Sequence, residues 1–152
     1  MNLVGADIAE ENGSLQALFG ANRLEVRGRE ALRSFVGRRV ILGIRPEDLD
    51  DASVVGRGSG GTISASVDIR EDLGSEILVH FGVGAPAVRG DDVQAALGEE
   101  ALEATSDSAR QKGSLFTARI SRDSRAEEGE AIELAVETNR LHFFEIETGG
   151  AI

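Results

Sequence analysis

The chain has 152 residues, a formal net charge of −11 and no cysteine, so disulfide bonds and thiolate chemistry are excluded. A surface of that charge repels phosphate backbones, and without Trp or Tyr the chain is poor in rings that stack on bases, so nucleic acid is not an expected partner. At this length roughly 70 % of the unfolded surface can be buried, and 41 % hydrophobic residues supply a mostly aliphatic core.

Short runs of strand-like sequence follow one another from the N-terminus. Asn12-Gly13, the strongest local hairpin signal, separates two half-buried runs in LVGADIAEENGSLQALFG. NRLEVRG then places Leu24 and Val26 on one face, and VILGI is a continuous apolar run typical of a fully buried strand. These patterns predict four strands before residue 45.

VILGI ends in an unusual corner, Arg45-Pro46-Glu47. A residue before Pro is pushed to an extended conformation, and the fixed φ of Pro suits the first position of a helical turn, where Glu47 meets the positive end. The strand must therefore end at this corner. The corner is either a strand exit whose Arg45 pairs with a nearby carboxylate, or a contact for a partner.

An acidic run follows the corner, and it consists of Glu47, Asp48, Asp50 and Asp51. It lacks the central Gly and the downstream Glu of a calcium-binding loop, so we expect a solvated acidic turn and no calcium site.

A GxGxxG match occurs at Gly56, Gly58 and Gly61. The motif binds phosphate only between a strand and a helix, and here the strand-like TISASV follows it. We therefore expect a flexible linker at these glycines.

A second hairpin is predicted from TISASVDI and ILVHFGV, which are separated by the tight turn EDLGSE. Each run puts four apolar residues on one side. The sets are Ile63, Ala65, Val67 and Ile69 in the first run, and Ile77, Val79, Phe81 and Val83 in the second.

Residues 84–114 interrupt this pattern. Asp91 and Asp92 are N-cap candidates, and apolar residues recur at helical spacing, which predicts an amphipathic helix from Asp91 to about Ala104. The polar residues to Gly113 predict a mobile loop. The runs LFTARIS, AIELAVE and RLHFFEI then add three strands, so the chain is expected to be all-β, a barrel or sandwich of about eight strands.

Catalytic motifs are absent from the sequence. The single lysine, Lys112, does not belong to a P-loop, and no serine lies in a GxSxG elbow. His80 and His142 each lie opposite the apolar set of their run, where a surface or rim position is expected. We expect no catalytic residue, no metal site and no cofactor in this chain.

Several motifs together resemble one known family. VILGIRPEDL, DIREDLGSEILVHF and LFTARIS, followed by GEAIELAVETNRLHFFEIETGGAI, are similar in this order to the C-terminal regulatory region of ATP-binding subunits of carbohydrate ABC importers, in the maltose, glycerol-phosphate and trehalose group. The resemblance covers residues 1 to about 83 and about 115 to 152. It implies an OB-type barrel, the TOBE fold, with additional strands and one short helical insertion at 84–114.

The resemblance also implies an organisation and a role. Residues 1–152 would form one regulatory domain, or two interleaved β subdomains, while the nucleotide-binding domain with its ATP and Mg²⁺ would lie upstream. The domain would hold two ATPase subunits together and, in some members, receive a regulatory protein or small effector. It would be cytoplasmic and attached to the membrane through the transporter's membrane subunits; no window approaches the ~18 apolar residues of a spanning helix, so no direct insertion is expected.

Six residues match family motifs that lie near contact and regulatory surfaces, and they are Arg45, Pro46, Glu47, Gly74, Ser75 and Glu76. In the closing segment, Phe143 and Phe144 match an apolar pair that we assign to the core. The implied homodimer should be weak in isolation, because two copies at −11 repel. One alternative is a stand-alone binding module for an anion or sugar effector, which needs backbone N–H groups and positive charge, and the chain is poor in the latter.

Overall fold

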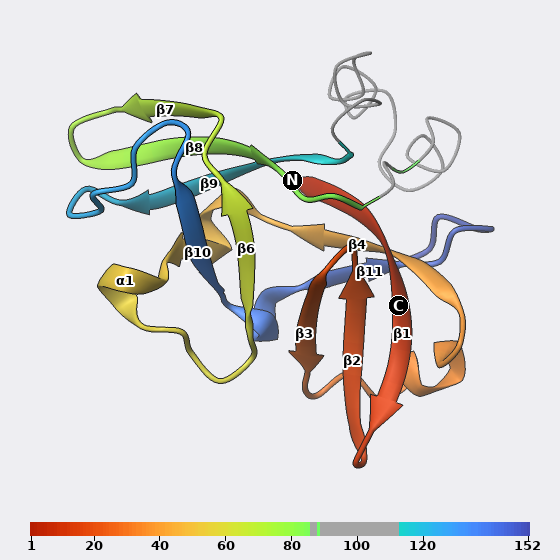
Figure 1. The fold of residues 1–152 in the computed structure, drawn as a ribbon. Helices are drawn as coiled ribbons and strands as arrows, with labels where there is room; N and C mark the ends of the chain where they lie inside the picture. Colours follow the sequence, from red (N-terminus) through yellow and green to blue (C-terminus); the bar gives the residue numbers. More distant parts are fainter. Residues whose placement is uncertain (86–87, 89–112) are drawn as a thin grey trace.

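The computed structural model describes residues 1–85, 88 and 113–152. The predicted helix and loop of residues 84–114 lie almost entirely outside this range. In the described part of the chain, eleven strands form three sheets (Figure 1), which confirms the all-β prediction. Sheet orders are β11-β4-β1-β2-β3, β5-β10-β6 and β7-β8-β9. The bounds are β1 Asn2–Glu11, β2 Ser14–Phe19, β3 Asn22–Val26, β4 Arg39–Ile44, β5 Leu49–Asp51, β6 Thr62–Ser66, β7 Ile69–Asp72, β8 Glu76–Gly82, β9 Leu115–Ser121, β10 Ala131–Val136 and β11 His142–Phe144.

The N-terminal hairpin follows its sequence signal. β1 and β2 pair antiparallel up to Glu11 and Ser14, and Asn12 and Gly13 both have positive φ, 51° and 80°. A tight two-residue turn of this kind matches the right-handed twist of the flanking strands. The hairpin prediction is confirmed, and β3 adds to its edge with Leu24 and Val26 buried.

β4 lies between β1 and β11 and is buried from Val40 to Ile44, as the apolar run VILGI predicts. Its central position also explains why a strand without polar alternation is stable here, since neither face meets water.

The expected strand 62–69 is wrong in one respect, because the chain changes sheets inside it. β6 pairs with β10, whereas β7 pairs with β8, and Ile69 is 52 % exposed. Val67 N donates to Glu130 O and the next amide, Asp68 N, donates to His80 O, so consecutive peptides belong to different sheets. The alternation of buried and exposed side chains therefore does not continue from β6 into β7. The hairpin around EDLGSE is formed by β7 and β8 alone.

The core is continuous across the sheets. Phe116 of β9 stacks on Phe19 of β2, with ring centroids 6.5 Å apart, and meets Phe81 of β8 at 5.8 Å. All three rings are at most 3 % exposed. In Figure 1 the red and orange strands of the large sheet and the green and cyan strands β7–β9 form two sides of the molecule, and these rings join them.

A polar contact also links the two sides. The side chain of the buried Asn2, at the start of β1, donates to Thr117 O and accepts from Thr117 N, both at 2.8 Å. The Asn2 side-chain amide therefore bonds the backbone of β9 in the way that a neighbouring strand would, and it holds β9 against β1.

The glycine-rich segment is more than a flexible linker. Gly60 is buried, its O accepts from Glu25 N of β3 at 2.8 Å, and a Cβ at this position would lie 2.4 Å from Thr138 side-chain atoms. Only glycine permits so close an approach between this segment and Thr138. Gly56 and Gly58 are exposed, as in a linker, but the segment is packed at Gly60, which covers the free edge of β3.

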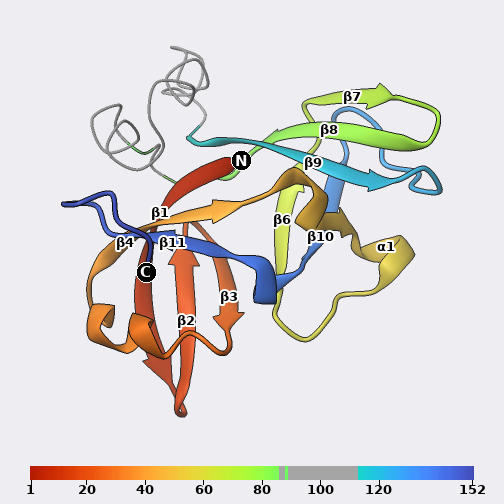
Figure 2. The ribbon, with the colours of Figure 1, turned by 180° about the vertical axis from the view of Figure 1, so that it is seen from behind.

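Several short elements have no strong sequence signal. They are the 3-10 helices η1 (Glu30–Phe35) and η4 (Thr138–Arg140), the one-turn helix α1 (Ala52–Val55) and strand β5, whereas the 3-10 helix η2 (Pro46–Asp48) is the helical turn that Pro46 predicts. Figure 2, which shows the molecule from behind, has α1 beside β10 on the side of the molecule away from β1–β3.

Candidate contact surface

The corner after β4 has the predicted local structure. Arg45 is extended, with φ −75° and ψ 145°, Pro46 is the first residue of η2, and Asp48 N donates back to Arg45 O at 3.0 Å. Arg45 and Glu47 are exposed and Pro46 is half-buried. The Arg45 side chain forms no hydrogen bond or ion pair with the described residues, so of the two alternatives for this corner the pairing of Arg45 with a nearby carboxylate is not found.

The acidic run after the corner is not a solvated turn. Asp48 and Asp51 are buried, 5 % and 4 % exposed, because η2 and α1 turn these two side chains inward. Arg140 Nε lies 3.1 Å from Asp48 Oδ1, but the contact is not aligned as a hydrogen bond and neither carboxylate oxygen has one. Burial raises the pKa of Asp48, and the charge of Arg140 only partly opposes this.

Asp48→Asn is expected to stabilise the fold by on the order of 1 kcal/mol at pH 7, because a neutral amide avoids the cost of a buried, poorly paired charge. The native state binds this proton more tightly than the unfolded state. The wild type should therefore lose stability as pH rises from the carboxyl's unfolded pKa through its raised folded pKa, and the variant should lack this loss. Urea unfolding between pH 4 and 7 measures both. A less stable variant at pH 7 would show that the Arg140 pair outweighs burial.

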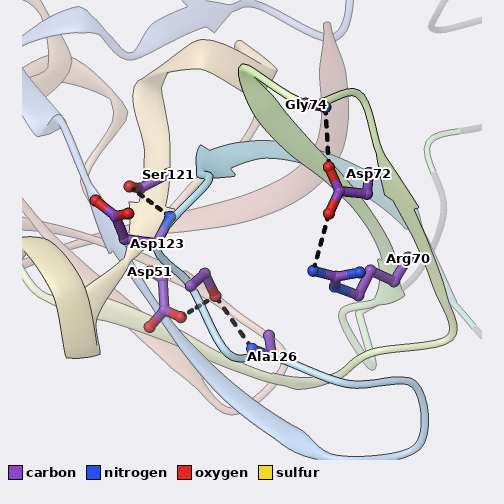
Figure 3. A network of polar contacts seen from close by, with 8 residues as sticks. Asp51, Arg70, Asp72, Gly74, Ser121, Asp123 and Ala126 are labelled. Atoms are coloured by element: carbon purple, nitrogen blue, oxygen red, sulfur yellow. Dashed lines mark hydrogen bonds and ion pairs between the residues drawn. The ribbon is translucent and has the colours of Figure 1, made fainter.

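Asp51, in contrast, has hydrogen bonds to both carboxylate oxygens. Its carboxylate accepts from Ser53 N at 2.9 Å, from Ser53 Oγ at 2.7 Å and from Ser124 Oγ, and it caps α1. Figure 3 draws the contact with the Ser124 hydroxyl, which also accepts from Ala126 N. Burial alone would raise its pKa, but the hydrogen bonds from Ser124 and Ser53 outweigh it and lower the pKa. The neighbouring Asp50 accepts from Ser121 N at 2.7 Å. Both carboxylates therefore tie the segment after the corner to the β9–β10 connection.

The LGSE turn is built around another aspartate. Asp72 accepts from Gly74 N at 2.9 Å and pairs with Arg70 at 3.4 Å, and Gly74 has φ 85° (Figure 3). Gly74 and Ser75 are exposed. Glu76 is half-buried and pairs with Arg119 of β9 at 2.7 Å.

β9 borders both predicted motifs. η2 packs against β9, and Glu76 faces Ser121 across the β8–β9 ladder. In the described part of the chain no hydrogen bond or ion pair joins the residues of the corner to Gly74, Ser75 or Glu76. The structure thus places the two motifs on neighbouring elements without direct polar contact.

The cluster that sequence reasoning missed lies beside the corner. Arg29 Nη2 donates to Leu141 O at 2.8 Å, which places its guanidinium at the backbone between Leu141 and His142. His142 is half-buried, and burial together with Arg45, Arg29 and Arg140 lowers its pKa. Arg29 and Leu141 are far apart in sequence, so no local pattern predicts that Arg29 lies near Arg140 and His142. The sequence signal for this cluster is limited to two basic residues, Arg140 and His142, on either side of the apolar Leu141.

The remaining candidates have structural partners. His80 lies between Glu71 Oε2, 2.9 Å from Nε2, and Thr117 Oγ1, 3.1 Å from Nδ1. Phe143 is buried, which confirms its assignment to the core. Phe144 is half-buried, which confirms the assignment in part. Among the described residues no group of three acidic, His or Cys side chains could hold a metal ion, and no helix there is long and apolar enough to cross a membrane.

An open cavity of about 410 Å³ lies between α1 and β10. Its charged walls largely satisfy each other: Arg57 pairs with Glu133 at 2.8 Å, and Glu133 also accepts from Thr62 at 2.7 Å. Arg125, also on its wall, forms no ion pair with described residues.

Comparison with known proteins identifies related sequences. Residues 1–49 match the family described as the MalK OB fold domain. The whole chain is 30 % identical to the trehalose/maltose import ATP-binding protein MalK of Thermococcus litoralis, and 72 % of it is 31 % identical to the trehalose import ATP-binding protein SugC of Mycobacterium tuberculosis. The chain spans 34 % and 27 % of these two proteins.

A solved structure shares the fold. The cytoplasmic molybdate-binding protein ModG aligns with a TM-score of 0.55 over 93 % of this chain and 94 % of its own, at 11 % identity. This likeness supports the OB-type fold.

Proposed function

We propose that this chain, which resembles the ATP-binding subunits of sugar ABC importers, is the non-catalytic C-terminal regulatory and dimerisation domain of such a subunit. The observation that carries the proposal is the 30 % identity along the whole chain to a trehalose/maltose import subunit. The corner and the LGSE turn support it, since both are present and both place polar groups at the surface. In this role the domain supports ATP-driven carbohydrate uptake at the cytoplasmic side of the membrane subunits.

The chain would contribute no nucleotide chemistry of its own. It has no P-loop, and the residues that phosphoryl transfer requires would belong to a separate nucleotide-binding domain.

Two identical subunits related by a two-fold axis meet through the same patch on each. The corner suits such a patch because Pro46 and η2 fix its backbone, so docking costs little entropy. Arg45 and Glu47 are exposed and two residues apart, so each can pair with the other residue of the second copy. Opposing this, two chains at −11 repel, and salt screens that repulsion over ~8 to 10 Å.

Sedimentation equilibrium of the isolated chain is expected to show a weak monomer–dimer equilibrium that tightens from low to moderate salt. Arg45→Glu should weaken the dimer at least about 10-fold, since it places two carboxylates against each other. The charge exchange Arg45→Glu with Glu47→Arg should restore the dimer because the reciprocal pair is rebuilt.

Arg125→Glu is the matched control, with the same change of net charge at an exposed residue outside the corner. A strict monomer into the high micromolar range at both salt concentrations would refute dimerisation. A dimer that Arg45→Glu leaves unchanged would move the interface away from the corner.

A further inference from the structure

Three guanidinium groups gather beside the corner although the chain carries a net charge of −11. Arg29 is fixed by its hydrogen bond to Leu141 O, at 2.8 Å. Arg140 is the last residue of η4 and lies 3.1 Å from Asp48 of η2. Two separate contacts thus bring the loop after β3, the corner and the segment before β11 to one place.

Arg45 joins this place through strand geometry. His142 pairs with Gly43 on β4, and the His142 Cβ lies 3.4 Å from where a Gly43 Cβ would be. Arg45 is two residues beyond Gly43 in an extended conformation, so its side chain leaves the backbone on the same side. The positive charge felt by His142 from Arg45, Arg29 and Arg140 agrees with this placement.

The positive charge of the cluster is incompletely neutralised at the surface. Asp48 is the carboxylate within the cluster, but its side chain is 2 % exposed, so it cannot be reached by solvent or ligand. Glu47 is exposed on the same short helix. Arg140 is 58 % exposed and Arg45 is exposed without a partner among the described residues, so both can donate outward.

We propose that Arg29, Arg45, Arg140 and His142 form a binding site for a phosphate group, free or as the monoester of a small metabolite. Guanidinium groups bind phosphate oxygens through paired, charge-assisted hydrogen bonds, which the geometry of ammonium groups does not provide. The His142 imidazole adds a further donor and gains a proton more readily when a dianion is bound. Asp48 lies 3.1 Å from Arg140 on the interior side and helps to position it. Its side chain is too buried to contact the ligand.

Such a site gives the domain a ligand beyond its proposed scaffold role. It shares Arg45 with the proposed two-fold pairing, so it is tested on the monomer, where that pairing does not occupy Arg45. Arg140 has no part in the proposed two-fold pairing, so Arg140→Gln tests the phosphate site without disturbing that pairing.

The experiment is an NMR titration of the full chain with inorganic phosphate and, separately, with glucose 6-phosphate, at constant ionic strength and at a concentration where the chain is monomeric. The expected result is saturable shifts of the His142 ring signals and a rise in the pKa of His142. Arg45→Gln and Arg140→Gln should each weaken binding about 10-fold or more, while Arg125→Gln should bind like the wild type.

Saturation by both probes would support a site for the phosphate group alone, and saturation by the sugar phosphate alone would support a site that also reads the ester. Linear shifts with both probes would overturn the proposal. It would also be overturned by binding that both Arg45→Gln and Arg140→Gln leave unchanged. These outcomes are separate from the dimer test, since a monomeric chain can pass or fail them.

Discussion

Phe116→Ala is expected to lower the free energy of unfolding by about 3 to 5 kcal/mol, the range for removing a fully buried aromatic ring. Phe116 is 1 % exposed. It contacts Phe81 on the neighbouring strand of its own sheet and Phe19 on the large sheet. The cavity would lie where the two sides of the molecule join, and strands on both sides would have to move together to close it. Urea unfolding followed by circular dichroism measures the loss.

Leu115→Ala is the matched control, one residue away on the opposite face of β9 and 41 % exposed. It should cost less than about 1 kcal/mol. Equal losses for the two variants would contradict the assignment of Phe116 to the junction of the sheets.

Asp51→Ala is expected to cost about 3 to 4 kcal/mol, because it removes a helix cap and three accepted hydrogen bonds, and it leaves the hydroxyl of Ser124 without this acceptor. Ser124 is 5 % exposed, so its hydroxyl cannot simply turn to water. Asp123→Ala is the control, since this neighbouring carboxylate is exposed.

The same network predicts a pH dependence. The folded pKa of Asp51 lies below its unfolded value, so its contribution is present above the unfolded pKa of about 3.9 and is lost as pH falls through the folded pKa. Wild type and Asp51→Ala should therefore converge in stability at acid pH. A constant difference down to pH 2 would mean that the carboxylate charge has no part in the network.

The sequence predicts the elements whose signals are local. Asn12-Gly13 forces its turn by its own backbone preferences, and Pro46 ends β4 by its ring and its missing N–H. The change of sheet between Val67 and Asp68 has no such signal, because the apolar alternation continues through it and the switch depends on partners from residues 80 and 130.

The candidate site divides in the same way. The corner and the LGSE turn are local structures and could be predicted from their residues. The burial of Asp48 could not be predicted, because every carboxylate of an acidic run is expected to be solvated. It depends on η4, whose Arg140 lies beside Asp48 in the folded chain. The cluster of Arg29 with Arg140 and His142 depends on a contact that bridges 112 positions, so only the folded chain shows it.

The ladder between β8 and β9 has a further consequence for chain length. It continues past the strands, since Val83 N donates to Ser114 O at 3.0 Å and Ser114 N donates to Ala85 O at 3.1 Å. The two ends of whatever connects Ala85 to Gly113 are thus held together by the sheet itself. The entropy of closing a connection grows only with the logarithm of its length, about 0.6 kcal/mol for each doubling. A change in the length of this connection is therefore expected to cost the fold little, because the core on either side of it is closed by the β8–β9 ladder.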